Sequence, residues 1–341
     1  MEYNLSGKTI LVTGATGYIG SRVVEQLVRT GAHVRALVRN PVKGQGLESA
    51  GASVATGDMT DPVSLERAVQ SCQTVFHFAG ATNEFKPRGY FERVNIEGTR
   101  LLTEAALRER VERFIHVSTV WVYGLWSGPG TCETSGCRES GQAYSDTKLK
   151  AERVVRRSID ERGLPAIILQ PSEVYGPGDP NWTRRPLELI RTGRMVLADG
   201  GRGLIHPIFI DDLVQGVLLA AGKGRLGETY ILCGLEAVTM REYFTHFARM
   251  LGKKRLPSIP GCLALGTATV AEWTARVFGR PPVFTRQEIL ATMATATYDG
   301  RKAERELGFA PKTTLAEGMR EVENWYQTAR GLDDRSSGST S

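Results

Sequence analysis

The sequence has 341 residues, of which 41% are hydrophobic and 23% are charged. These fractions are typical of a folded globular protein, and they exclude a chain that is mainly disordered, collagen-like or coiled-coil. The 43 Lys and Arg residues exceed the 37 Asp and Glu residues and give a net charge of +6. The excess is scattered in mixed runs such as residues 107–113, so we expect solvated helix faces and no nucleic-acid partner.

The first half of the chain alternates short apolar runs with helical patterns. The apolar runs that predict buried strands are residues 8–13, 33–38, 53–55, 74–78, 113–118 and 166–169. The helical patterns are residues 18–30, a helix opened by Asp61-Pro62, residues 91–107 and residues 144–159. Alternation of this kind predicts an α/β fold, in which a doubly wound parallel sheet is covered by helices on both faces.

After Gln170 the pattern changes. Pro and Gly cluster in residues 171–186 and predict loops, residues 208–221 return to a helical pattern, and residues 234–326 are mostly helical. We therefore expect residues 3–170 and 204–232 to form the sheet domain. A smaller, mostly helical substrate lobe would comprise residues 171–203 and 233–330, followed by a disordered polar tail at residues 331–341.

The ends and the cysteines point to a compartment. The first residues lack the basic and then apolar segments of a signal peptide, and the five cysteines are odd in number and scattered. We expect a cytoplasmic protein with no metal site and no integral membrane span. The most apolar stretch, residues 263–270, predicts a core or substrate-pocket helix, with a membrane-surface helix as the alternative.

A glycine-rich turn lies between the first predicted strand and the first predicted helix. Gly14, Gly17 and Gly20 give the spacing GxxGxxG. Glycines let a backbone approach a pyrophosphate closely, and the following helix offers free N–H groups to the phosphates. This turn therefore predicts a dinucleotide-binding Rossmann fold. The other residues of the turn that we expect at the cofactor are Thr16, Tyr18 and Ile19.

The end of the second strand distinguishes NADP from NAD. An acidic residue there accepts hydrogen bonds from a ribose 2′-hydroxyl, whereas an Arg pairs with a 2′-phosphate. This chain has Arg39 at that position and Lys43 nearby. We favour NADP, with NAD as the alternative if Arg39 only stacks on the adenine.

A catalytic group is predicted from three residues. Tyr144 and Lys148 have the spacing i, i+4 on a predicted helix, which places both side chains on one face. Thr119 stands at the end of the fifth strand, and ligands of open α/β sheets bind beyond the carboxyl ends of the strands. Together with the glycine turn, these residues indicate an enzyme.

These motifs resemble those of the extended short-chain dehydrogenase/reductase family over nearly the whole chain. The nearest branch contains the hydroxysteroid dehydrogenases and dihydroflavonol reductases. The matching segments are the glycine turn, Gly57-Asp58, residues 77–80, residues 94–99, Ser118-Thr119, Tyr144 with Lys148, residues 171–177 and residues 206–213.

The resemblance implies a role for each matching residue. Lys148 would bind the nicotinamide ribose and lower the pKa of Tyr144, Tyr144 would be the general acid or base, and Thr119 would bind the substrate oxygen. Further cofactor contacts would come from Asp58, Met59, Ala79, Gly80, Ala81, Asn95, Val117, Pro171 and Val174. Substrate contacts would come from Thr82, Thr119, Trp121, Ser172, Tyr175 and Trp182. The resemblance also implies a homodimer formed through the helices after Phe91 and Tyr144.

Three function classes remain within this resemblance. We favour an NAD(P)-dependent carbonyl reductase or alcohol dehydrogenase for a small or medium, apolar substrate. The favouring features are Arg39, the apolar residues 263–270 and the segment from residues 280–283 to residues 303–311. A nucleotide-sugar epimerase with tightly bound NAD is the alternative, with Asn181, Arg184, Arg185 and Arg202 as candidates for binding a diphosphate.

Two further activities fit the sequence less well. A non-catalytic NmrA-like nucleotide sensor usually lacks the Tyr and Lys pair that this chain has. Sugar dehydratases of the family have a Thr-Asp-Glu pattern at the end of the strand. This chain has Trp121 in the position of an acid.

Overall fold

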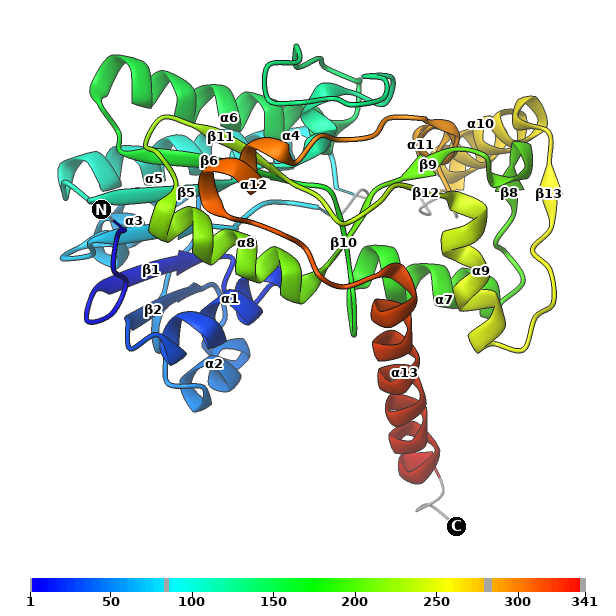
Figure 1. The fold of residues 1–341 in the computed structure, drawn as a ribbon, viewed down its shortest axis with the longest axis horizontal. Helices are drawn as coiled ribbons and strands as arrows, with labels where there is room; N and C mark the ends of the chain where they lie inside the picture. Colours follow the sequence, from blue (N-terminus) through cyan, green and yellow to red (C-terminus); the bar gives the residue numbers. More distant parts are fainter. Residues whose placement is uncertain (1, 83–85, 279–283, 338–341) are drawn as a thin grey trace.

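A seven-stranded sheet is the centre of the fold. The computed structural model describes residues 2–82, 86–278 and 284–337 (Figure 1). The strands of the sheet are β1 (Thr9–Thr13), β2 (His33–Val38), β3 (Ser53–Thr56), β4 (Thr74–His77), β5 (Arg113–Val117), β6 (Ala166–Pro171) and β11 (Thr229–Leu232). They pair in the order β11-β6-β5-β4-β1-β2-β3, and every pairing is parallel. The expected doubly wound parallel sheet is confirmed.

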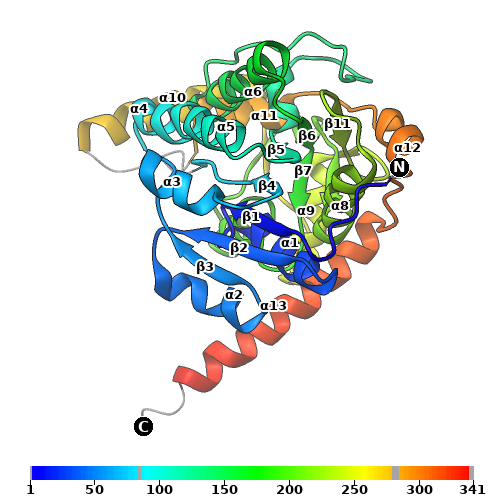
Figure 2. The ribbon, with the colours of Figure 1, turned by 90° about the vertical axis from the view of Figure 1, so that its left-hand side faces the viewer.

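Helices cover both faces of this sheet (Figure 2). One face carries α3 (Pro62–Val69), α5 (Gly98–Arg108) and α6 (Ala143–Arg162), and the other carries α1 (Tyr18–Arg29), α2 (Gln45–Ser49) and α8 (Ile210–Lys223). Side chains alternate along β1 accordingly. Ile10 and Val12 join the buried cluster that contains Val24, whereas Leu11 joins the cluster that contains Leu65. Such two-sided burial explains why the strands are nearly continuous apolar runs.

The helix expected at residues 91–107 is built from three pieces. These are α4 (Arg88–Phe91), a π-helical turn η2 (Glu92–Glu97) and α5. At the junction, a Cβ atom on Gly98 would lie 3.0 Å from the Cβ atom of Met59, so the helix approaches the loop after β3 closely. The π-helical turn carries the buried Asn95, and π-helical turns often occur at functional sites.

The second half of the chain contains more strand than expected. Within the segment expected to be loops, β7 (Glu173–Tyr175) pairs in parallel with β10 (Pro207–Phe209). The helix expected from residue 208 therefore begins only at Ile210, after β10. The other elements between residues 180 and 293, outside the seven-stranded sheet and α8, are η4 (Pro180–Arg184), α7 (Arg185–Arg191), β8 (Leu197–Ala198), η5 (Asp199–Gly201), β9 (Leu204–Ile205), β12 (Val238–Thr239), α9 (Met240–Met250), β13 (Ser258–Ile259), α10 (Gly261–Phe278) and α11 (Arg286–Met293).

The last two helices differ from the expected division of the chain. Helix α12 (Arg301–Leu307) contacts α8 and β11, so it lies against the sheet domain and not in the substrate lobe. Helix α13 (Leu315–Ser337) contacts α9 and β10 and continues into the tail that was expected to be disordered (Figure 1). Residues 338–341 and the segment 280–283 lie outside the described residues. Within the described ranges, no helix has the length and apolar character needed to cross a membrane.

Candidate active site

The glycine turn connects β1 to α1 at the carboxyl edge of the sheet. Gly14 has a φ of +68°, and a Cβ atom on it would lie 2.6 Å from the backbone nitrogen of Ala79. The Gly17 N–H donates to the Gly14 carbonyl at 2.9 Å. In the described first turn of α1, Gly17 supplies no capping side chain and no residue is acidic, so the N–H groups there are available to an anion.

Cations and one carboxylate border this turn. Arg39 follows β2 directly, is exposed, and its guanidinium donates to the Tyr90 hydroxyl at 3.4 Å. Lys43 is also exposed, in the short 3₁₀ helix η1 (Pro41–Gly44) that Asn40 caps. After β3, the Asp58 carboxylate accepts hydrogen bonds from the backbone N–H and the hydroxyl of Thr60, at 2.8 and 2.7 Å.

Asn95 fixes the loop that follows β4. Its Oδ1 accepts the Ala81 N–H at 2.6 Å, and its Nδ2 donates to the Ala81 carbonyl at 3.3 Å and to the Thr147 hydroxyl at 3.0 Å. The amide thus joins this loop to helix α6. These hydrogen bonds therefore hold the loop that contains Ala79 and Gly80 in place.

The three predicted catalytic residues lie together. The Thr119 side chain hydrogen-bonds the Tyr144 phenol, and the Lys148 ammonium donates to the Val117 carbonyl at 2.6 Å. Burial raises the pKa of Tyr144 to about 12, while the hydrogen bond with Thr119 opposes that rise. Burial lowers the pKa of Lys148 to about 8. The protein's own groups therefore hold the Tyr144 pKa above its usual value.

The start of α6 is anchored firmly. The buried Asp146 accepts the Ser140 N–H at 2.7 Å and the Gly141 N–H at 3.2 Å, and it pairs with Arg88 at 3.2 Å. From the substrate lobe, the Gln287 amide donates to the Ser140 carbonyl at 3.0 Å. These contacts tie the start of the helix that carries Tyr144 to α4 and α11.

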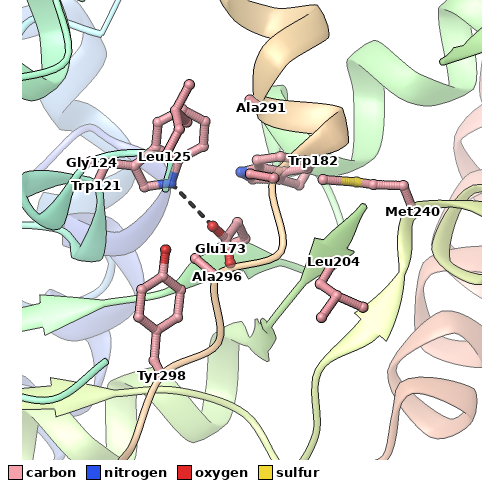
Figure 3. A pocket seen from close by; sticks show the side chains of 11 residues that line it. Trp121, Gly124, Leu125, Glu173, Trp182, Leu204, Met240, Ala291, Ala296 and Tyr298 are labelled. Carbon is pink, nitrogen blue, oxygen red and sulfur yellow. Dashed lines mark hydrogen bonds between the residues drawn. The ribbon is translucent and has the colours of Figure 1, made fainter. Parts of the chain in front are cut away.

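A small cavity adjoins these residues on the side of the substrate lobe (Figure 3). Its volume is about 30 Å³. It is lined by Trp121, Gly124, Leu125, Glu173, Trp182, Leu204, Met240, Ala291, Ala294, Ala296 and Tyr298. Trp121 belongs to the 3₁₀ helix η3 (Val120–Tyr123), and its backbone N–H donates to the Thr119 hydroxyl at 3.3 Å. The cavity wall is thus hydrogen-bonded directly to a predicted catalytic residue.

The structure divides the residues that were expected to bind substrate. Trp121 and Trp182 both line the cavity, and their ring centroids lie 6.4 Å apart. Tyr175 instead points into the core, where its ring contacts Phe209 and Tyr243. Ser172 is buried at the end of β6, and Thr82 is exposed next to residues outside the described ranges.

Sequence reasoning missed two polar residues of the cavity, Glu173 and Tyr298. Glu173 lies within residues 171–177, one of the segments that resemble the family, and this was the available signal. Tyr298 lies in a segment without any motif, so only the fold brings it to the site.

The residues at the edge of the sheet fit a dinucleotide. The backbone at Gly14 leaves space that a Cβ atom would fill, and the first turn of α1 has free donors. At the ends of β5 and β6, the buried hydroxyls of Ser118 and Ser172 have no hydrogen-bond partner among the described residues. Unpaired polar groups of this kind suit the polar edge of a cofactor. The described residues contain no cluster of His, Cys, Asp or Glu arranged to hold a metal ion.

Comparisons with known sequences agree with this geometry. The family model described as the NAD dependent epimerase/dehydratase family matches residues 10–233. A relative from Stigmatella aurantiaca, the 4-hydroxy-2-methyl-3-oxo-4-farnesyl-3,4-dihydroquinoline-1-oxide ketoreductase, is 30% identical, and the match covers 90% of this chain and 93% of the relative. A 3-beta-hydroxysteroid dehydrogenase from Mycolicibacterium neoaurum is 26% identical, with 93% of this chain and 91% of the relative covered.

A solved structure shares the fold. The dTDP-glucose 4,6-dehydratase DesIV from Streptomyces venezuelae, solved with NAD and TYD bound, superposes with a TM-score of 0.78 at 25% identity. The match covers 95% of this chain and 98% of that chain.

Proposed function

This chain belongs to the NAD-dependent epimerase/dehydratase family, and we propose that within it the protein is a carbonyl reductase or alcohol dehydrogenase. The single observation that carries the proposal is the cavity beside Thr119, whose lining is almost entirely aromatic and aliphatic. Such a lining suits the apolar edge of a substrate better than the polar face of a sugar. The similarity to a ketoreductase and to a hydroxysteroid dehydrogenase supports the same choice.

In this proposal the protein's side chains handle a proton. Tyr144 donates its phenolic proton to the substrate oxygen during reduction and accepts it during oxidation, while the Thr119 hydroxyl holds the same oxygen. A Tyr with a pKa of about 12 is almost entirely protonated at neutral pH, so the oxidation direction needs further positive charge near the phenol to stabilise the phenolate. A bound nicotinamide dinucleotide supplies or accepts the hydride and carries such a charge when it is oxidised. Lys148 is held beside the site by the Val117 carbonyl.

The cavity argues against the epimerase alternative. The part of the substrate that enters this cavity meets the Glu173 carboxyl group and, among the described lining residues, no Lys or Arg, which suits an uncharged group better than a phosphate. Of the four cations and amides considered for this role, Arg185 pairs with Glu288 and Arg184 lies over the Trp325 ring at 5.2 Å. Arg184 and Arg185 are therefore already engaged in contacts within the protein.

We further propose that the cofactor is NADP. The exposed Arg39 directly after β2 is suited to a 2′-phosphate, and the neighbouring Asn40 is not an acid.

The test is the substitution Tyr144→Phe. The variant is expected to lose at least about a hundredfold in turnover of a reducible ketone while it still binds the dinucleotide. Near-normal turnover would contradict the proposed role of the phenol. The nucleotide released on denaturation of the purified protein separates the two function classes, because stoichiometric, tightly bound NAD would favour the epimerase.

A further inference from the structure

A carboxyl group without a charged partner lies in the wall of the cavity. Glu173 is 8% exposed, its Oε1 accepts the Trp121 indole N–H at 3.1 Å, and its Oε2 accepts the His206 backbone N–H at 3.2 Å. Among the residues that the structure describes, no Lys or Arg forms an ion pair with it. The carboxyl group also accepts its own backbone N–H, so about one of its roughly four acceptor sites is left for a further hydrogen bond.

His206 does not supply the missing charge. Its Nδ1 accepts the Tyr298 backbone N–H at 3.2 Å, so the ring proton is on Nε2, which faces the Gly234 carbonyl at 3.1 Å. Burial lowers the pKa of this imidazole, which is therefore neutral. His206 therefore does not pair with Glu173 as a cation, and the Glu173 carboxyl remains a hydrogen-bond acceptor for a group that binds beside it.

The Tyr298 hydroxyl is a second polar group on the same space. Figure 3 shows it directed toward the region of Glu173 and Trp121, from the opposite wall. The hydroxyl forms no hydrogen bond within the described part of the chain, although its ring is held against His206 with centroids 6.2 Å apart. An acceptor and a free hydroxyl therefore face one small cavity whose remaining lining is apolar.

We infer that Glu173 and Tyr298 form a recognition subsite for a hydroxyl group of the substrate, at the end of the molecule remote from the reacting carbonyl. A hydroxyl can donate to the Glu173 carboxyl and accept from the Tyr298 phenol at once, whereas a methyl group leaves both unpaired. The cavity of about 30 Å³ has room for a group of this size, because roughly 10–15 Å³ of cavity volume on this measure is enough to hold a water molecule. This assignment rests on the proposed function, and it narrows the substrate class to hydroxylated ring ketones.

Trp121 sets the separation of the two ends. Its backbone N–H bonds Thr119 and its indole N–H bonds Glu173, so the catalytic oxygen site and the hydroxyl subsite lie at the two ends of one residue. Because the cavity holds about 30 Å³, only the hydroxyl-bearing end of a ring ketone would enter it. The substrate ring would then lie along the indole, with its carbonyl at Thr119 and its hydroxyl at Glu173.

The test compares 6-hydroxy-1-tetralone with 6-methyl-1-tetralone as probes. Both kcat/KM with NADPH and Kd from quenching of Trp fluorescence are measured for the wild type, Glu173→Leu and Tyr298→Phe. The control Asp212→Asn alters another buried carboxylate that accepts two backbone N–H groups, outside the cavity. We expect the wild type and the control to prefer the hydroxylated ketone by at least about tenfold, and Glu173→Leu to lose the preference. Tyr298→Phe is expected to lose part of it.

The two readouts separate this subsite from the proposed reaction. A binding preference that depends on Glu173 without any reduction would support the subsite and overturn the proposed function. Reduction without a preference, or a preference that persists in Glu173→Leu, would overturn the subsite alone, as would failure of either ketone to bind. If Glu173→Leu does not fold, because it leaves two buried N–H groups unpaired, Tyr298→Phe decides, and an unchanged preference in that variant rejects the subsite.

Discussion

The free energy of unfolding of the wild type is expected to fall as pH rises because of Glu173, and the substitution Glu173→Gln should abolish this fall. Burial raises the pKa of this carboxyl group to about 7, against 4.5 for an ordinary Glu. Its protonated form is therefore favoured in the fold, so the stability that it confers is complete below about pH 4.5 and is lost as pH rises through about 7. At 1.36 kcal/mol for each pKa unit, the full loss is about 3 kcal/mol.

Other titratable groups near Glu173 do not account for the expected difference between the two proteins. Burial raises the pKa of Tyr298, Tyr243 and Cys233, so these three stay neutral in the fold between about pH 5 and 8, and burial lowers the pKa of His206, which is present in both proteins. The remaining carboxylates are common to both proteins, so their contributions cancel in the comparison.

The assay is urea unfolding of the wild type and of Glu173→Gln across this pH range, followed by Trp fluorescence. The free energy of unfolding of the variant should rise relative to that of the wild type by up to about 3 kcal/mol between about pH 5 and 8. The reasoning would be refuted if the difference in the free energy of unfolding between the two proteins did not change with pH. Such a result would mean that Glu173 has the same pKa in the folded and the unfolded state.

Two further predictions concern the cofactor. Arg39→Ala should weaken NADPH binding by about tenfold or more and leave NADH binding unchanged, with Arg67→Ala as a control. Comparable losses for both nucleotides, measured by titration, would argue against a 2′-phosphate contact. Gly20→Ala should weaken binding of either nucleotide by at least about tenfold, because the added Cβ atom meets the Gly14 carbonyl. Gly46→Ala, where nothing lies within 4 Å of the added atom, is the matched control and should bind normally.

The sheet domain was predictable because its strands are buried on both faces. Residues 33–38 form β2 as expected, and the other apolar runs match strands within about two residues. The π-helical turn at residues 92–97 was not predictable, since one wide turn hardly changes the spacing of apolar residues. Strands of three residues, such as β7 and β10, are too short to show a period. A homodimer and a cytoplasmic location stay predictions.

The site was predictable only where a motif marks it. Tyr144, Lys148 and Thr119 follow from spacing and from their place at strand ends, and the structure brings them together. Glu173 and Tyr298 are far apart in the sequence and meet only because the substrate lobe returns to the sheet. No local pattern encodes such a meeting.

The double attachment of Trp121 limits how the substrate range of this enzyme can change. A substitution here keeps the backbone N–H that bonds Thr119 but removes the indole N–H that bonds Glu173, so a new specificity gained there would leave the buried Glu173 carboxyl with one partner fewer. Leu204, Met240 and Ala291 face the same space from separate elements of the substrate lobe. Laboratory evolution toward larger or smaller ring systems should therefore accumulate changes on that side first and leave the indole untouched.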